Sequence, residues 1–123
     1  MKSAHVEVVL DLQERIAVVH LGGDVDMEDV PDTVDAFTTA LHDTSTVGTL
    51  IDLSALDFAD SALVNQLLAT CSGHEVKRRP LMMCGPLMPV VRRVLEITGT
   101  DMILPLAVDR REAIEWLRSA GTV

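Results

Sequence analysis

The chain has 123 residues, of which 48% are hydrophobic, and a formal net charge of −9. This length supplies one hydrophobic core and favours a single domain over residues 1–123. A strongly acidic surface repels nucleic acid and anionic membranes, so we expect neither as a partner.

The two cysteines, Cys71 and Cys84, lack Cys-x-x-Cys spacing, which indicates neither a disulfide framework nor a zinc site. Glu7, Asp11 and Glu14 exclude a signal peptide at the amino terminus. No window approaches the roughly 18 uncharged apolar residues of a membrane helix. We therefore expect a cytoplasmic protein that carries no metal or other cofactor.

The first third of the chain predicts a β-hairpin and a helix. Residues 5–10 and 15–21 carry loosely alternating apolar side chains on either side of a polar turn. From residue 27 to 43, apolar side chains recur at steps of four, three and four, which is typical of a helix. Pro31 is tolerated only near a helix start, so the helix should begin between residues 26 and 30.

A strand, a loop and a helix start are predicted next. Residues 50–53 form a short apolar run typical of a buried strand, and residues 54–59 predict a loop. Asp60 and Ser61 follow, with Ser61 in the first turn of a helix. A helix start presents unpaired N–H groups and a partial positive charge, so this junction is a plausible place for chemistry.

The helix from residue 61 should reach about residue 72. Gly73 either ends it or occupies a weak interior position. The basic residues 77–79 are interpreted as a solvated helix end.

The last third alternates strands and helices. Residues 81–84 predict a strand, residues 89–98 a helix that Gly99 ends, and residues 102–107 a short edge strand. Asp109 should cap a last helix, with Glu112 at the capping-box position. Together these elements predict an α/β fold: a mixed, mostly parallel sheet of four to five strands, an amino-terminal β-hairpin and four helices.

Two interpretations of Asp60 and Ser61 remain open. Asp and Ser are common N-cap residues, so the simplest role is capping. In the functional interpretation Ser61 receives a phosphate, which the helix N-terminus would stabilise and Asp60 would repel. The phosphate would add roughly two negative charges at one spot and switch any interface built there.

Asp24 and Asp26 follow the end of the second predicted strand. They form either a solvated loop or part of the same site as Ser61. Loops at the carboxyl ends of adjacent parallel strands gather at one edge of a sheet, which would bring these aspartates close to Ser61.

Catalysis is not expected. Asp52, Asp57 and Asp60 have no His or Cys beside them, which disfavours a metal or acid–base site. Ser61 lacks the G-x-S-x-G elbow of a hydrolase, and no glycine-rich phosphate loop is present. A small hydrolase that uses Ser61 is retained as a third hypothesis, and it requires a histidine within hydrogen-bond reach.

Three segments carry a family resemblance. Gly23-Asp24-Val25-Asp26 is similar to a G-[ED]-[LV]-D motif after a second strand. Residues 50–61, LIDLSALDFADS, resemble a strand and loop that end in Asp-Ser, and residues 89–99 resemble a helix that a proline opens and a glycine closes. The chain thereby resembles the STAS domain, and within it the bacterial anti-sigma factor antagonists (anti-anti-sigma factors).

The resemblance implies a partner-switching mechanism. Such a protein binds an anti-sigma factor, itself a serine kinase, and so frees a sigma factor for transcription. The kinase then phosphorylates the serine at Ser61, the complex dissociates, and a PP2C-type phosphatase resets the switch. The partner-binding residues implied are Asp24, Asp26, Asp60, Ser61, Ala62 and Leu63.

The chain departs from the family pattern at Leu63. The family usually continues Asp-Ser-[SAT]-Gly-Leu, and Leu63 stands at the glycine position, where it reduces the room for a partner. One interpretation makes Leu63 a surface anchor for a different partner. The alternative function is a non-phosphorylated STAS protein-interaction subunit of a transporter or signalling complex, which would use the same face.

Overall fold

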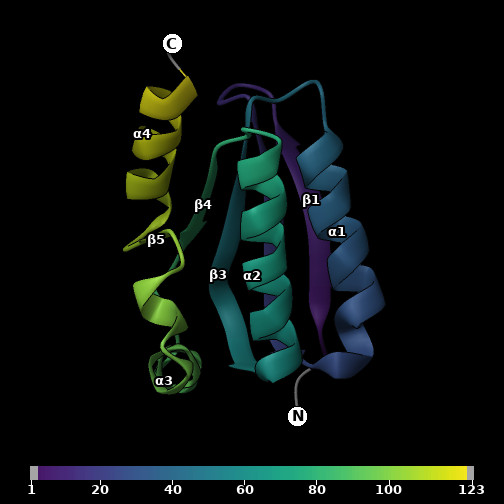
Figure 1. The fold of residues 1–123 in the computed structure, drawn as a ribbon, viewed down its shortest axis with the longest axis vertical. Coiled ribbons are helices and arrows are strands. Elements are labelled where there is room, and N and C mark those ends of the chain that lie inside the picture. The colour runs from purple at the N-terminus through teal and green to yellow at the C-terminus, as the bar shows by residue number, and fades with distance from the viewer. Residues whose placement is uncertain (1–2, 122–123) are drawn as a thin grey trace.

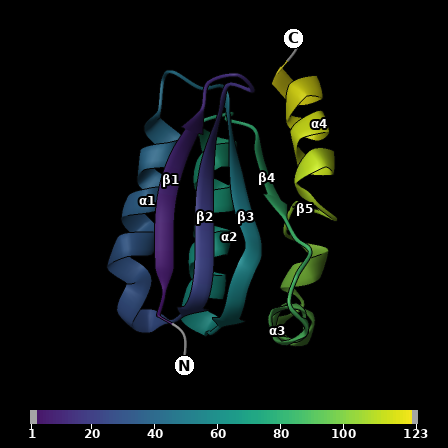
Figure 2. The same ribbon diagram turned by 180° about the vertical axis from the view of Figure 1, so that it is seen from behind.

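Five strands form one mixed sheet in the spatial order β1-β2-β3-β4-β5, with helices on both faces (Figure 1, Figure 2). The computed structural model describes residues 3–121, so the predicted domain bounds of 1–123 extend beyond it at both ends. β1 and β2 pair antiparallel, whereas the other neighbours pair parallel, which confirms the predicted α/β fold with an amino-terminal hairpin and four helices. The elements in chain order are β1 (His5–Asp11), β2 (Ile16–Val25), η1 (Met27–Asp29), α1 (Val30–His42), β3 (Gly48–Ala59), α2 (Ser61–Val76), β4 (Leu81–Cys84), α3 (Pro89–Thr98), η2 (Thr100–Met102), β5 (Leu106–Ala107) and α4 (Arg110–Gly121).

Alternating side chains of the central strands supply two cores, one on each face of the sheet. Val19 and Ile51 belong to the larger core, which α1, α2 and α3 complete. Val18 and Leu50 belong to the smaller core, which α4 covers. Figure 1 shows α1 and α2 side by side over β1–β3, and Figure 2 shows α4 near the β4–β5 edge.

β3 runs to Ala59, so the predicted loop over residues 54–59 is wrong. Two register shifts in the β2–β3 ladder let the two strands stay paired to their ends. Gly23 lies at one of these shifts with φ 70°, a conformation that costs little only for glycine. The bulges break the alternation of side chains, which is why the strand pattern is not visible in the sequence.

The last strand is shorter than predicted. Only Leu106–Ala107 pairs with β4, and Thr100–Met102 forms the 3-10 helix η2 instead. Pro105 has no N–H to donate, but its carbonyl accepts from the Met83 amide at 2.8 Å. The predicted position of this strand at the sheet edge is confirmed.

The predicted carboxyl-terminal end of α3 and the predicted N-cap of α4 are confirmed. α3 ends at Gly99, which adopts the left-handed conformation with φ 74°. Asp109 Oδ1 accepts from the Glu112 amide at 2.9 Å, as an N-cap does. The Glu112 carboxylate accepts from the Val108 amide at 3.3 Å, one residue before the amide that a capping box would use.

α2 is one turn longer than predicted. It continues to Val76, and Gly73 is an interior position rather than a C-terminal stop. A Cβ on Gly73 would lie 3.5 Å from Leu41 Cδ2 on α1, an ordinary van der Waals distance.

A buried polar network fastens the end of α2 to β3. His74 is 1% exposed, with Nδ1 2.7 Å from the Thr70 carbonyl and Nε2 2.9 Å from the Thr49 hydroxyl. Arg79 donates from Nε to the same hydroxyl at 2.9 Å and from its terminal nitrogens to four oxygens in residues 43–48. The interpretation as a solvated helix end is therefore wrong for Arg79.

Candidate protein-interaction site

The carboxyl ends of β2 and β3 meet at one edge of the sheet. Asp24 on β2 pairs with Phe58 on β3, and Asp26 and Asp60 directly follow the two strands. Ser61 begins α2 at the same edge and is exposed. The structure therefore brings together residues that are far apart along the chain. We call Asp24, Asp26, Asp60 and Ser61 the Ser61 edge.

Asp60 connects two helix starts. Its backbone is extended, with φ −107° and ψ −178°, and its Oδ1 accepts from the Leu63 amide at 3.0 Å. Its Oδ2 accepts from the Met27 amide, also at 3.0 Å. The capping interpretation of Asp60 is confirmed, and the second bond makes the same carboxylate a link between α2 and η1.

Asp26 is held by a capping box. Its Oδ1 accepts from the Glu28 amide at 2.9 Å, and its own amide donates to Asp29 Oδ2 at 3.0 Å. This local exchange of hydrogen bonds satisfies the start of η1 and fixes the path of the chain from β2 into α1.

The first turn of α2 keeps amides available beside Ser61. The Leu63 amide is occupied by Asp60 Oδ1, and the Val64 amide donates to the Asp60 carbonyl at 3.2 Å. Within residues 3–121, the Ser61 and Ala62 amides donate to no protein group. A phosphate on Ser61 would lie next to these two donors and the positive end of the helix.

The interpretation of Leu63 as a surface anchor is wrong. Its side chain is 1% exposed and belongs to the larger core. Of the predicted partner-binding residues on α2, Ser61 is exposed and Ala62 is half-buried. The leucine at the family's glycine position therefore fills the interior and leaves the outer surface to Ser61 and Ala62.

Two apolar residues at the Ser61 edge were missed from the sequence. Met27 is 71% exposed and Phe58 is 41% exposed. A strand residue and the first residue of a short helix give no periodic signal of exposure, so only the fold reveals them. Exposed apolar side chains among charged ones are typical of protein interfaces.

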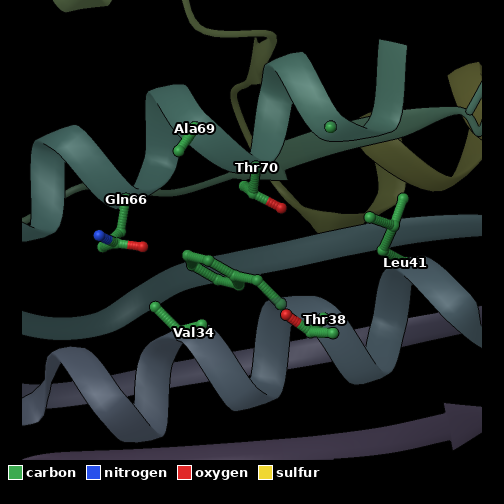
Figure 3. A pocket seen from close by; sticks show the side chains of 8 residues that line it. Val34, Thr38, Leu41, Gln66, Ala69 and Thr70 are labelled. Carbon is green, nitrogen blue, oxygen red and sulfur yellow. The ribbon is translucent and has the colours of Figure 1, made fainter. Parts of the chain in front are cut away.

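A shallow hollow of about 180 Å³ lies between α1 and α2 (Figure 3). Figure 3 shows Val34, Thr38 and Leu41 of α1 facing Gln66, Ala69 and Thr70 of α2. None of the residues that line it can titrate or act as a nucleophile at neutral pH. It is a seam between two packed helices rather than a catalytic pocket.

The thiols are poor nucleophiles. Burial, with Glu75 nearby, raises the pKa of Cys71 to about 11. Burial and the neighbouring Asp52 raise the pKa of Cys84 to about 12. Both side chains are therefore protonated at neutral pH, and thiolate chemistry is disfavoured.

The described residues do not support the other catalytic hypotheses, which are a metal or acid–base site and a small hydrolase. In the described part of the chain, no three His, Cys, Asp or Glu side chains gather as metal ligands. Asp52 lies on the α4 face, with Oδ2 4.0 Å from Arg110 and 3.7 Å from His20. His74 lies about 20 Å along α2 from Ser61, and no hydrogen bond among residues 3–121 joins Ser61 to a histidine.

None of the described helices is long and apolar enough to span a membrane.

Comparison with models of known protein families assigns the chain to a family. A family model described as "Mlab, STAS domain" matches residues 8–105. The chain belongs to the STAS domain family. No significant match was found among the curated proteins.

Several solved structures share the fold of this chain. An anti-sigma factor antagonist from Mycobacterium paratuberculosis is 27% identical, with a TM-score of 0.79, and the match covers 94% of this chain and 95% of that one. The phosphorylated Bacillus protein SpoIIAA is 22% identical with a TM-score of 0.64, covering 94% of this chain and 100% of that one. The RsbS protein of Moorella thermoacetica is 18% identical with a TM-score of 0.77, covering 97% of this chain and 99% of that one.

Proposed function

We propose that this STAS protein is an anti-sigma factor antagonist that binds an anti-sigma factor serine kinase through the Ser61 edge. Binding releases a sigma factor in the cytoplasm, and phosphorylation of Ser61 switches the antagonist off. A PP2C-type phosphatase then restores it. The observation that carries the proposal is an exposed serine in the first turn of α2, at the sheet edge where Asp24, Asp26 and Asp60 also lie.

The chemistry of the Ser61 edge suits a protein partner. Asp24 and Asp26 are half-buried acidic residues. Met27 and Phe58 add exposed apolar surface at the same edge. A partner face with basic side chains and a shallow apolar pocket would complement this arrangement. The rest of the acidic surface would speed the encounter with such a face.

A phosphate at Ser61 would change the contact surface more than the fold. The helix N-terminus would offer the phosphate about 0.3–1 kcal/mol of stabilisation, and the Ser61 and Ala62 amides would be nearby donors. The phosphate adds about 1.5–2 negative charges beside the Asp60 carboxylate. An interface optimised for a neutral serine hydroxyl would then lose its packing and its charge balance.

The burial of Leu63 supports the proposal. A leucine at the glycine position would obstruct a partner only if its side chain pointed outward. Because Leu63 lies in the core, the outer surface of the first turn consists of Ser61 and Ala62. The departure from the family pattern is therefore absorbed by the interior.

The test is phosphorylation by the cognate anti-sigma kinase. The protein is incubated with the kinase and Mg-ATP, and the modified residue is located by peptide mass spectrometry. We expect one phosphate on Ser61 and none on the Ser61→Ala variant. The Ser72→Ala variant is the matched control, because Ser72 is an exposed serine on the same helix and its loss should leave phosphorylation unchanged.

The alternative is a STAS protein-interaction subunit that is not phosphorylated. A kinase that binds the protein but leaves Ser61 unmodified would contradict the phosphate switch and favour this alternative. A phosphate on a different residue would contradict the role of the Ser61 edge as the acceptor.

A further inference from the structure

A groove of about 510 Å³ lies over β4, between the carboxyl-terminal half of α2 and the segment that leads into β5. Figure 1 shows α2 and α4 on either side of β4 at this place. α1 and α2 cover β1–β3, and α4 packs on the opposite face of the sheet. The apolar side chains that line the groove include Leu68, Cys71, Leu81, Ile103, Pro105 and Trp116.

The rim of the groove is unusually apolar for a surface. Ile103 is 70% exposed, and Trp116, the one tryptophan of the chain, is 49% exposed. An exposed tryptophan beside an apolar groove is typical of a binding anchor, because it buries a large area at little cost in side-chain entropy.

The charge around the groove differs from that of the rest of the molecule. Residues 75–79, at the end of α2, contain three basic residues and one acidic residue, in a chain whose formal net charge is −9. Lys77 and Arg78 follow the end of α2, where Arg79 and Glu75 line the groove. The five side-chain hydrogen bonds of Arg79 go to neutral oxygens, and the nearby Asp43 carboxylate offsets part of its charge, so Lys77 and Arg78 supply most of the positive charge here.

We propose that this groove docks a partner-protein segment with an apolar face flanked by acidic side chains. Its apolar residues would enter between Leu68 and Ile103 and contact Trp116, and its acidic residues would face Lys77 and Arg78. The groove extends along α2 from Leu68, about 10 Å along the helix from Ser61, to Glu75, about 20 Å from it. The surface is therefore separate from the Ser61 edge, and the inference does not depend on the proposed function.

Trp116 gives a direct measurement of docking. Two synthetic amphipathic peptides share a leucine face and carry flanking glutamates in one and flanking lysines in the other. We expect the glutamate peptide to shift the Trp116 emission to shorter wavelength, with an affinity that falls as salt rises. The lysine peptide should leave the emission unchanged at the same concentrations, although the whole protein has a net charge of −9.

Matched variants locate the binding. Ile103→Asp should weaken the glutamate peptide by about tenfold or more, whereas Ile97→Asp should not, although Ile97 is 72% exposed on α3. The Lys77→Glu, Arg78→Glu double variant should also weaken it. Circular dichroism checks that each variant is folded.

Several results would overturn the proposal. They are no emission shift with the glutamate peptide, an equal or larger shift with the lysine peptide, and equal losses for Ile97→Asp and Ile103→Asp. Sedimentation that reveals a dimer broken by Ile103→Asp would assign the groove to a second copy of the chain and also overturn it.

Discussion

Met27 and Asp60 are 33 residues apart in the chain, yet the Met27 amide donates to Asp60 Oδ2 at 3.0 Å. The other oxygen of the same carboxylate accepts from the Leu63 amide at 3.0 Å. One side chain therefore caps the start of α2 and holds the start of η1. The position of Ser61 relative to Asp26 depends on this bridge.

Replacement of Asp60 should loosen both helix starts. Asp60→Ala removes an N-cap and a charge-assisted hydrogen bond, so we expect a loss of about 1–2 kcal/mol in the free energy of unfolding, measured by urea denaturation. Hydrogen exchange at the Met27 and Leu63 amides should accelerate together. Asp32→Ala, an exposed first-turn residue of α1, is the control and should cost about 0.5 kcal/mol or less. Equal losses for the two variants would contradict the bridging role.

Leu63 should behave as a core residue. Leu63→Ala creates a cavity in the larger core, and we expect a loss of about 2–5 kcal/mol in the free energy of unfolding. Leu12→Ala, at a 65% exposed leucine, should change stability by about 0.5 kcal/mol or less. If Leu63→Ala preserved stability and reduced partner binding alone, the residue would be a surface anchor after all.

Two glycines should respond in opposite directions to the same substitution. Gly73→Ala adds a methyl at an ordinary contact distance from Leu41 and removes a flexible helix position, so thermal unfolding should show a gain of about 0.5–1 kcal/mol. Gly99→Ala should lose about 1–2 kcal/mol, because φ 74° strains any residue with a Cβ even though open space surrounds it. Destabilisation by Gly73→Ala would mean that α1 and α2 pack more tightly than the distances indicate.

His74 should make stability depend on pH. Burial lowers the pKa of His74, the hydrogen bond to the Thr70 carbonyl opposes this in part, and the nearby Arg79 charge adds a smaller lowering effect. The neutral ring donates from Nδ1 to that carbonyl and accepts at Nε2 from the Thr49 hydroxyl, whereas a protonated ring could no longer accept.

The sign follows from the unfolded state, which binds the proton first, at a pKa of about 6.5. The His74 contribution is therefore complete above pH 6.5 and is lost as the pH falls below that value toward the lower folded pKa. The midpoint of urea unfolding, compared at pH 7.5 and pH 5.5, measures the loss of this contribution. His74→Gln should flatten the decline, and His42→Gln, at an exposed histidine on α1, should retain it. A decline of the same size in His74→Gln would assign it to other groups.

Much of the fold could be predicted because its signals are local. The apolar period over α1, the proline that opens α3 and Gly99 at its end each depend on neighbouring residues. The length of β3 could not be predicted, because the two register shifts depend on pairing between β2 and a strand about 30 residues later. The role of Arg79 was hidden for the same reason, since its acceptors lie in the loop after α1 and at the start of β3.

The Ser61 edge was predictable in outline. The rule that parallel strands gather their following loops at one edge places Asp24 and Asp26 near Ser61. It does not give the direction of a single side chain, so the burial of Leu63 and the exposure of Met27 and Phe58 appear only in the fold. The second hydrogen bond of Asp60 likewise requires the position of η1.

The phosphate switch predicts one difference in affinity above all. Isothermal titration compares the cognate anti-sigma kinase, without ATP, against the wild type, Ser61→Ala and Ser61→Asp. We expect Ser61→Ala to bind within about twofold of the wild type, and Ser61→Asp to bind at least about tenfold more weakly, a difference of about 1.4 kcal/mol. Equal binding of Ser61→Asp and the wild type would contradict a charge-operated switch at Ser61.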